Sequence, residues 1–269
     1  MRILIPLDGS DVAQAAVGFA RTLTRNAAGT LILFHATWPG MPGEQADKRL
    51  ESELEALRAY GVEATLERRP TPRDEETGLV IASAADELNA DLIVMTTHGR
   101  GGLGRWLFGS VAEQVMGSAK MPVLLIPSGL PLNWPVDHHA AVLVALDGTD
   151  KAKRPLEPAV DMARALDAEI ILAQILPTGE ESNPVDSEST ELTHEYLASV
   201  GADLEAVGLS TRQLVRHGEP AKAIGALAQE LNVAALAIGG PDRGDSGSKT
   251  LGQIALGIIR RSDVPVLIA

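Results

Sequence analysis

Cysteine is absent from this chain of 269 residues, and aromatic residues are scarce, with three Phe, three Trp and two Tyr. The absence of cysteine excludes a disulfide framework and a thiolate metal site. The scarcity of aromatics requires a core built from Ala, Val, Leu and Ile. Such a core favours a parallel sheet covered by helices, because strands buried on both faces contain continuous aliphatic runs.

Clustered basic residues and long apolar runs are also missing. The net charge is −13, which argues against nucleic acid as a partner, because Lys and Arg clusters supply most of the affinity for its phosphates. No run approaches the roughly 18 apolar residues of a membrane-spanning helix. The apolar start, residues 3–7, is shorter than the core of a signal peptide. We therefore expect a cytoplasmic protein with no membrane partner.

Two copies of one pattern fill the chain. Residues 3–10 (ILIPLDGS) match 142–149 (VLVALDGT), and 122–126 (PVLLI) match 265–268 (PVLI). Between the copies, Pro127, Pro131 and Pro135 interrupt regular structure because proline lacks a backbone donor. We predict a first domain over 1–128, a linker over 129–140 and a second domain over 141–269.

Aliphatic runs alternate with helical periodicity in both copies, which is typical of βαβ units in a parallel sheet. We predict two tandem Rossmann-like α/β domains, each a five-stranded parallel sheet with helices on both faces. The predicted strands are 3–7, 30–36, 62–68, 91–96 and 122–126, then 141–146, 169–175, 209–215, 233–238 and 264–268. The predicted helices are about 11–25, 44–60, 75–89 and 109–118, then 152–167, 189–206, 220–231 and 252–261.

Two loops that follow strands hold the candidate functional residues. In an open parallel sheet, ligands bind beyond the carboxyl ends of strands where the strand order reverses. Asp8 follows the first strand and either caps the next helix or contacts a ligand. The loop 96–110 follows the fourth strand and is rich in glycine before Gly109 and Ser110 open a helix. Glycines and a helix N-terminus offer backbone N–H groups to an anion, so this loop predicts a phosphate site.

The histidines fit structural roles better than ligand roles. His35 ends a predicted buried strand and is expected to be a satisfied polar group of the core. His98 lies in the glycine-rich loop, where we favour stabilisation of the loop over ligand contact. His138 and His139 lie in the linker without a carboxylate or thiol at ligand spacing, so we expect no metal there.

These residues resemble the universal stress protein family. The resemblance rests on Asp8, the run His98-Gly99-Arg100, the spacing Gly99-x9-Gly109-Ser110 and the closing strand 122–125. It covers nearly the whole chain, and the two copies resemble the family's tandem-domain members. In its nucleotide-binding branch, a Gly-x-x-Gly-x9-Gly-Ser/Thr loop holds ATP phosphates, an Asp after the first strand contacts the nucleotide, and the end of the second strand lies beside adenine.

The resemblance implies an adenine nucleotide alpha hydrolase-like fold and an ATP site, with Mg²⁺ on the phosphates, in the first domain. The positions that it implies most directly are Asp8, Ala36, Gly99, Gly109 and Ser110. The full set of candidate contacts is Pro6, Leu7, Asp8, Ala36, Thr96, His98, Gly99, Arg100, Gly102, Gly109, Ser110 and Val111. Thr96 departs from the motif, because it stands where the family has its first glycine.

The second domain departs further from the motif. Gly252 aligns with Gly109, but Gln253 replaces Ser110 and Asp242 replaces Gly99. A carboxylate repels a polyphosphate, at a cost of several kcal/mol for a close like-charge pair. We therefore predict that the second domain binds ATP weakly or not at all, and that Asp147 serves there as a cap.

Three functions fit the sequence. We favour a stress-response regulatory protein, not an enzyme, in which ATP in the first domain biases conformation or partner binding. A slow ATPase or nucleotide-dependent enzyme is the second, although Asp8 is the one strand-end carboxylate near the proposed site. A ligand-free interaction protein is the third, and Thr96 keeps it open. The family pairs domains through the final strand, and the aliphatic edges 123–126 and 266–268 fit intramolecular pairing or a homodimer.

Overall fold

The structure, a computed structural model, describes residues 1–10, 14–25, 29–37, 43–71, 76–97, 109–127, 129–131, 134, 140–178, 187–241 and 251–269. These residues form two compact units. The N-terminal unit holds the described residues of Met1–Val136 and of Pro241–Leu251, and the C-terminal unit holds those of Asp137–Gly240 and Gly252–Ala269. The predicted site residues His98, Gly99, Arg100 and Gly102 lie outside the described residues.

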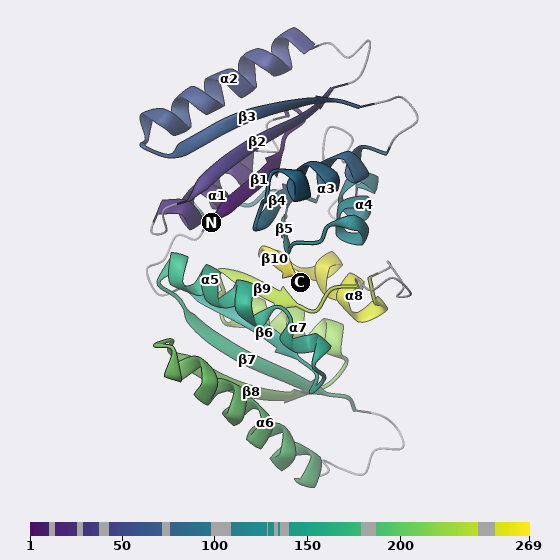
Figure 1. The fold of residues 1–269 in the computed structure, drawn as a ribbon. Coiled ribbons are helices and arrows are strands. Elements are labelled where there is room, and N and C mark those ends of the chain that lie inside the picture. Colours follow the sequence, from purple (N-terminus) through teal and green to yellow (C-terminus); the bar gives the residue numbers. More distant parts are fainter. Residues whose placement is uncertain are drawn as a thin grey trace. The chain divides into compact units, whose positions relative to one another are not determined.

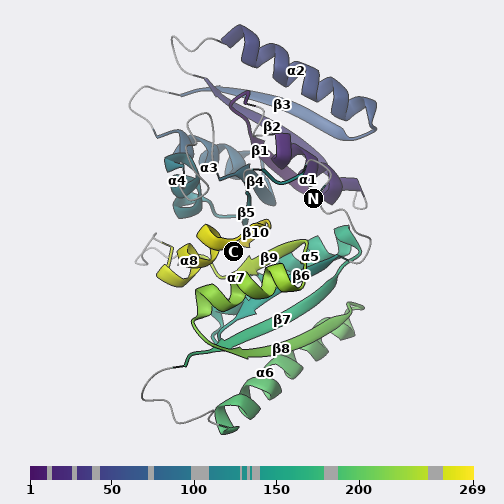
Figure 2. The same ribbon diagram turned by 180° about the vertical axis from the view of Figure 1, so that it is seen from behind.

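The N-terminal unit is a parallel sheet with helices on both faces (Figure 1). Its strands lie in the order β3-β2-β1-β4-β5, so the strand order reverses between β1 and β4. Figures 1 and 2 show α1 on the face opposite α3 and α4. The elements are β1 (Arg2–Pro6), α1 (Gln14–Arg25), β2 (Thr30–Thr37), α2 (Gly43–Ala59), β3 (Glu63–Pro70), α3 (Thr77–Glu87), β4 (Leu92–Thr96), α4 (Ser110–Ser118) and β5 (Val123–Ile126).

The C-terminal unit repeats this arrangement. Its parallel strands lie in the order β10-β9-β6-β7-β8, and α5 and α7 cover opposite faces of the sheet (Figures 1 and 2). The elements are β6 (Ala141–Leu146), a 3₁₀ turn η2 (Lys151–Lys153), α5 (Leu156–Leu166), β7 (Glu169–Leu176), α6 (Ser187–Ala206), β8 (Thr211–His217), α7 (Pro220–Glu230), β9 (Ala235–Ile238), α8 (Gln253–Arg261) and β10 (Val266–Ile268).

Both cores are aliphatic, as the scarcity of aromatics predicts. Ile3, Leu4 and Ile5 of β1 are fully buried. Helices cover both faces of the parallel sheet, so side chains that point to either face are shielded from water. In the C-terminal unit, Val142 and Leu143 of β6 are equally buried. The doubly buried strands at the centre of each sheet confirm the predicted fold class.

One predicted helix is wrong in detail. The segment predicted as a single helix over 152–167 forms η2 followed by α5, which begins at Leu156. Pro155 and Pro158 account for the break, because proline lacks an N–H and fits only the first turn of a helix, where no intrahelical partner is needed. Within the part of the chain that the structure describes, no helix is long and apolar enough to cross a membrane.

Candidate functional site

The carboxyl ends of β1 and β4 place four of the predicted site residues at the point where the strand order reverses. Pro6 ends β1 and is followed by Leu7 and Asp8, and Thr96 ends β4. The two strands pair directly, with Ile3 opposite Leu92. In a sheet of this order, such a point is where ligands bind.

Asp8 holds the turn that leaves β1. Its Oδ1 accepts a hydrogen bond of 2.9 Å from the Ser10 backbone N–H, and Gly9 between them has a φ of 75°. Glycine suits that positive φ because it has no Cβ. The Ser10 hydroxyl oxygen is buried and has no hydrogen-bond partner among the described residues. The predicted cap role of Asp8 concerns residues 11–13, which lie outside the described residues.

The end of β2 joins the same turn. The Leu7 N–H donates to the Phe34 carbonyl at 2.8 Å, and the Leu7 carbonyl lies 2.7 Å from His35 Nδ1. A carbonyl only accepts, so we assign the ring proton to Nδ1. His35 is buried, as predicted, but its Nε2 has no hydrogen-bond partner among the residues the structure describes. Ala36, the predicted neighbour of adenine, is buried beside it.

The start of α4 is tied to the end of β4 and β5. The Thr97 N–H donates to the Ile126 carbonyl at 3.1 Å, and the Gly109 N–H donates to the Thr97 carbonyl at 3.0 Å. The first hydrogen bond of the helix runs from the Glu113 N–H to the Gly109 carbonyl. The N–H groups of the first helical residues, Ser110 and Val111 among them, therefore have no partner inside the helix and suit an anion.

Backbone conformation does not require glycine at position 109. Gly109 is the N-cap of α4 with φ −66° and ψ 141°, which any residue adopts. A Cβ there would lie 3.4 Å from the Thr97 carbonyl oxygen, an ordinary contact. At Gly240 of the C-terminal unit, by contrast, a Cβ would lie 3.1 Å from Ile268 Cγ2 and 3.2 Å from the Ala269 carbonyl oxygen. Packing thus explains Gly240 but not Gly109.

Helix α3 supports the N-terminal half of α4 by close contact. The Gln114 Oε1 accepts a hydrogen bond of 3.0 Å from the Gly78 N–H at the start of α3. A Cβ on Gly78 would lie 2.8 Å from the Val111 carbonyl oxygen and would also overlap Gln114 Cβ. Gly78 is therefore needed for the two helices to approach, and its close contact with Val111 positions one of the candidate site residues.

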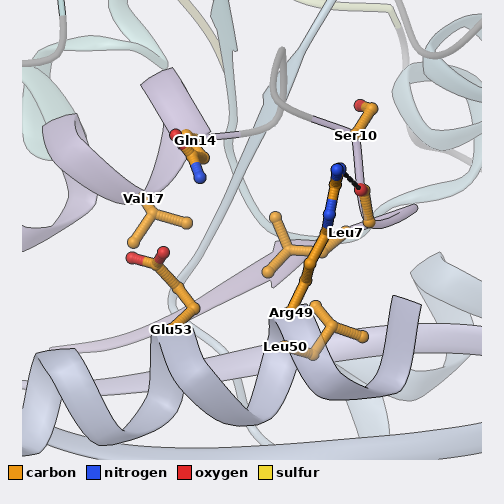
Figure 3. A pocket seen from close by; sticks show the side chains of 8 residues that line it. Leu7, Ser10, Gln14, Val17, Arg49, Leu50 and Glu53 are labelled. Atoms are coloured by element: carbon orange, nitrogen blue, oxygen red, sulfur yellow. Dashed lines mark hydrogen bonds between the residues drawn. The ribbon is translucent and has the colours of Figure 1, made fainter. Parts of the chain in front are cut away.

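A small pocket lies on the other side of the β1 turn, between α1 and α2 (Figure 3). The Arg49 guanidinium of α2 donates to the Gly9 carbonyl at 2.9 Å. Half-burial raises the pKa of the Glu53 carboxyl above its ordinary value, an effect that the charge of Arg21 opposes. The lining residues are Leu7, Gly9, Ser10, Gln14, Val17, Arg49, Leu50 and Glu53.

The C-terminal unit builds the equivalent turn with different side chains. Asp147 Oδ1 accepts from both the N–H and the hydroxyl of Thr149, at 2.9 and 2.6 Å. The Thr149 Oγ1 in turn accepts from the Ala152 N–H at 3.2 Å. Thr149 thus bonds a backbone N–H of η2 directly, whereas Asp147, the predicted cap, bonds Thr149 and no N–H of η2 among the described residues; the N-cap residue of η2 is Asp150. Gly252 opens α8 as Gly109 opens α4, with Gln253 in place of Ser110.

The structure places all eight of the predicted site residues that it describes at or after the carboxyl ends of β1, β2 and β4. Pro6, Leu7, Asp8 and Ala36 share the β1 and β2 ends, Thr96 ends β4, and Gly109, Ser110 and Val111 lead into α4. The described residues include no group of three or more His, Cys, Asp or Glu side chains suited to a metal ion. Sequence reasoning missed Arg49 and Gly78, since neither belongs to a motif, and their roles come from contacts with distant residues.

Comparison with known proteins agrees with this architecture. The model of the universal stress protein family matches residues 1–127 and 140–269. A universal stress protein of Mycobacterium bovis is 25% identical over 289 residues, which cover 99% of this chain and 96% of that protein. One of Methanocaldococcus jannaschii is 34% identical over 142 residues, which cover 46% of this chain and 81% of that protein.

A solved structure supports the fold along the whole chain. The crystal structure of a universal stress protein from Archaeoglobus fulgidus has a TM-score of 0.75 and 22% identity, and the match covers 100% of this chain and 97% of that one. At this identity the likeness concerns the fold alone. Together with the two family-model matches, it confirms the predicted resemblance. The chain belongs to the universal stress protein family, of which it carries two copies in tandem.

Proposed function

We propose that this protein is a stress-response regulator that binds ATP in its N-terminal unit and uses the bound nucleotide to bias conformation or partner binding. The site lies where the strand order reverses, with the adenine end toward Ala36 and the phosphates toward the start of α4. Mg²⁺ is proposed to accompany the phosphates.

The observation that carries this proposal is the pair Gly109 and Ser110 at the start of α4, where α8 has Gly252 followed by Gln253. The backbone angles of Gly109 are open to any residue, and a Cβ would make one ordinary contact with the Thr97 carbonyl, among the described residues. A phosphate that approaches the first N–H groups of α4 supplies a reason for glycine, because a side chain there would keep the anion away from the amides. Ser110 adds a hydroxyl donor at the next position.

Asp8 contributes the second half of the site. One of its carboxylate oxygens is engaged by the Ser10 N–H, which sets the direction of the carboxylate at the end of β1. In the family's nucleotide-binding branch an Asp at this position contacts the nucleotide, and we propose the same contact here. Because Asp8 serves the turn and its own position is fixed, we favour binding over hydrolysis as its role.

We propose that the C-terminal unit does not share this activity. Gln253 offers a longer side chain than Ser110 at the start of α8, and Asp242 places a negative charge where the first copy has Gly99. The cost of a carboxylate near a polyphosphate outweighs one added hydrogen bond, since like charges in close contact cost several kcal/mol and a hydrogen bond contributes about 1 kcal/mol.

The test is calorimetric titration of ATP, with and without Mg²⁺, into the full chain and two matched variants. Gly109→Glu adds a negative charge at the N-cap of α4, and Gly252→Glu adds the same charge at the N-cap of α8, where no described atom lies within 4 Å of a Cβ. We expect one ATP per chain, an affinity loss of at least about tenfold for Gly109→Glu, and wild-type affinity for Gly252→Glu.

Each of three results would contradict part of the proposal. No binding at millimolar ATP would refute the nucleotide site and favour a ligand-free interaction protein. Two ATP molecules per chain, or a loss caused by Gly252→Glu, would refute restriction to the N-terminal unit. Steady release of phosphate that depends on Asp8, tested with Asp8→Ala, would make the protein an ATPase.

A further inference from the structure

We propose that Arg49 is a positioning residue for the N-terminal nucleotide site, an inference that rests on the proposed function. Arg49 lies on α2, and its guanidinium donates a hydrogen bond of 2.9 Å to the carbonyl of Gly9. Figure 3 shows the side chain crossing from the helix to the turn after β1. No site motif contains Arg49, so its role comes from this contact.

The Gly9 carbonyl lies at the centre of the turn that orients Asp8. Asp8 Oδ1 accepts the Ser10 N–H on one side of Gly9, and the Gly9 φ of 75° lets the chain reverse there. The Gly9 peptide can rotate unless its carbonyl is held, because glycine has no Cβ to restrict it. A hydrogen bond from a charged donor to that carbonyl favours the one rotation that keeps the carboxylate of Asp8 in place.

The second copy shows what the first copy lacks inside the turn itself. Thr149, at the position of Ser10, bonds Asp147 through its hydroxyl at 2.6 Å and accepts from Ala152. The Ser10 hydroxyl is buried without a hydrogen-bond partner among the described residues. The turn of the C-terminal unit is therefore stabilised by the Thr149 side chain within the turn. In the N-terminal unit the Ser10 side chain gives no such support, and Arg49 of α2 supplies a contact instead.

The helix position that supplies this contact has changed between the copies. The ends of α2 and α6 align the two helices. The Val62 N–H donates to the Leu57 carbonyl at the end of α2, and the Leu209 N–H donates to the Leu204 carbonyl in the same way at the end of α6. Counting back from these two leucines, Arg49 corresponds to Tyr196. The Lys153 ammonium of η2 lies 5.5 Å from the centre of the Tyr196 ring, so this side chain also lies beside the segment that follows the turn. Its hydroxyl, however, has no hydrogen-bond partner among the described residues.

Helix α2 provides its own control for the experiment. Arg58 also donates to a backbone carbonyl, that of Ala64, at 3.2 and 3.0 Å, and Ala64 lies at the start of β3, the opposite end of the strand from the proposed site. Arg49→Met and Arg58→Met each remove one positive charge and one contact between guanidinium and carbonyl. Arg49→Lys keeps the charge and one possible donor.

The test measures ATP affinity by calorimetry and the hydrogen exchange of the Ser10 amide in the full chain. We expect Arg49→Met to weaken ATP binding about three- to fivefold, the loss of one exposed hydrogen bond from a charged donor, and to speed exchange of the Ser10 amide in the absence of nucleotide. We expect Arg49→Lys to recover most of both, and Arg58→Met to change neither.

The outcomes separate this inference from the function on which it rests. Absence of ATP binding by the wild-type chain refutes the proposed function, and with it this role. Wild-type binding with an unchanged affinity in Arg49→Met refutes the positioning role alone. An affinity loss with an unchanged Ser10 exchange rate, or an equal loss in Arg58→Met, also refutes it, because the effect would then come from charge or from general destabilisation.

Discussion

The packing of α3 on α4 leads to a prediction about Gly78. Replacing Gly78 with Ala places a Cβ 2.8 Å from the Val111 carbonyl oxygen and into Gln114 Cβ. The Val111 carbonyl belongs to the backbone of α4, and Gln114 Cβ is bonded directly to that backbone. Neither atom can therefore move away without a shift of α4 itself. The substitution also disturbs the hydrogen bond of 3.0 Å between the Gly78 N–H and Gln114 Oε1.

The magnitude follows from two opposing effects. Overpacking of a closely packed contact costs about 1–3 kcal/mol, and the gain in helix propensity from Gly to Ala is at most about 1 kcal/mol. Gly78 is the second residue of α3, where the propensity gain is smaller than in a helix interior. We expect Gly78→Ala to destabilise the N-terminal unit by about 1–2 kcal/mol, which lowers its melting temperature by roughly 3–8 °C.

A matched substitution in the other copy has the opposite expectation. Gly225 lies inside α7, and its added Cβ would come no closer than 3.6 Å to Arg261 Cβ. With ordinary contact and no positive φ, Gly225→Ala gains helix propensity without overpacking. We expect it to stabilise the C-terminal unit by roughly 0.5–1 kcal/mol.

Tryptophan fluorescence distinguishes the two units in thermal unfolding. Trp38, Trp106 and Trp134 all precede residue 141, so their emission follows the N-terminal half, while circular dichroism follows both. Gly78→Ala should lower the midpoint temperature of the fluorescence transition. Gly225→Ala should leave that midpoint unchanged and raise the temperature at which the rest of the dichroism signal is lost. A Gly78→Ala protein as stable as wild type, or a Gly225→Ala protein that loses as much as Gly78→Ala, would refute the packing argument.

Three further predictions concern titration and the second turn. Burial raises the pKa of Glu53, so the folded state disfavours its ionised form. Glu53→Gln should therefore have a higher melting temperature than wild type at pH 7. This difference in melting temperature should disappear as the pH is lowered to the ordinary pKa of Glu. Burial and the charges of Asp147 and Asp150 raise the pKa of the Tyr196 phenol, so wild type loses stability as pH rises past 10, and alkaline denaturation of Tyr196→Phe should lack this component. Asp147→Ala removes two hydrogen bonds from Thr149, and we expect the free energy of unfolding in denaturant to fall by about 1 kcal/mol while ATP affinity stays unchanged. A change in ATP affinity would contradict the assignment of the site to the first copy.

The sequence alone determined the architecture, because the information is local and repeated. Aliphatic runs such as 142–146 identify buried strands without knowledge of their partners, and alternation with helical periodicity leaves a parallel sheet as the arrangement that buries them. The duplication shows twice where strands end, which locates Asp8 and Asp147 in equivalent turns. One helix, α5, begins later than its predicted range, because Pro155 and Pro158 confine its start and η2 forms in front of it.

The sequence also predicts candidate site residues after the strands, but it does not show what packs around each of them. Gly109 and Gly240 both stand in connections that leave a strand, and the sequence gives no means to tell them apart. The structure separates them, because Gly240 is confined by Ile268 and Ala269 whereas Gly109 has ordinary space around its Cα among the described residues. The space around Gly109 is therefore compatible with the proposed approach of a phosphate to the start of α4.

Tertiary structure alone decided the contacts around the candidate site. Arg49 meets Gly9 across 40 positions of sequence, His35 meets Leu7 across 28, and Gly78 meets Gln114 across 36. Each pair forms because two elements pack at the same end or on the same face of the sheet. Neither periodicity nor composition predicts which groups of those elements will then lie within hydrogen-bonding distance of one another. Sequence therefore determined the strands, the helices and the repeated turns, and the packing of helices around the sheet decided which residues hold those turns in place.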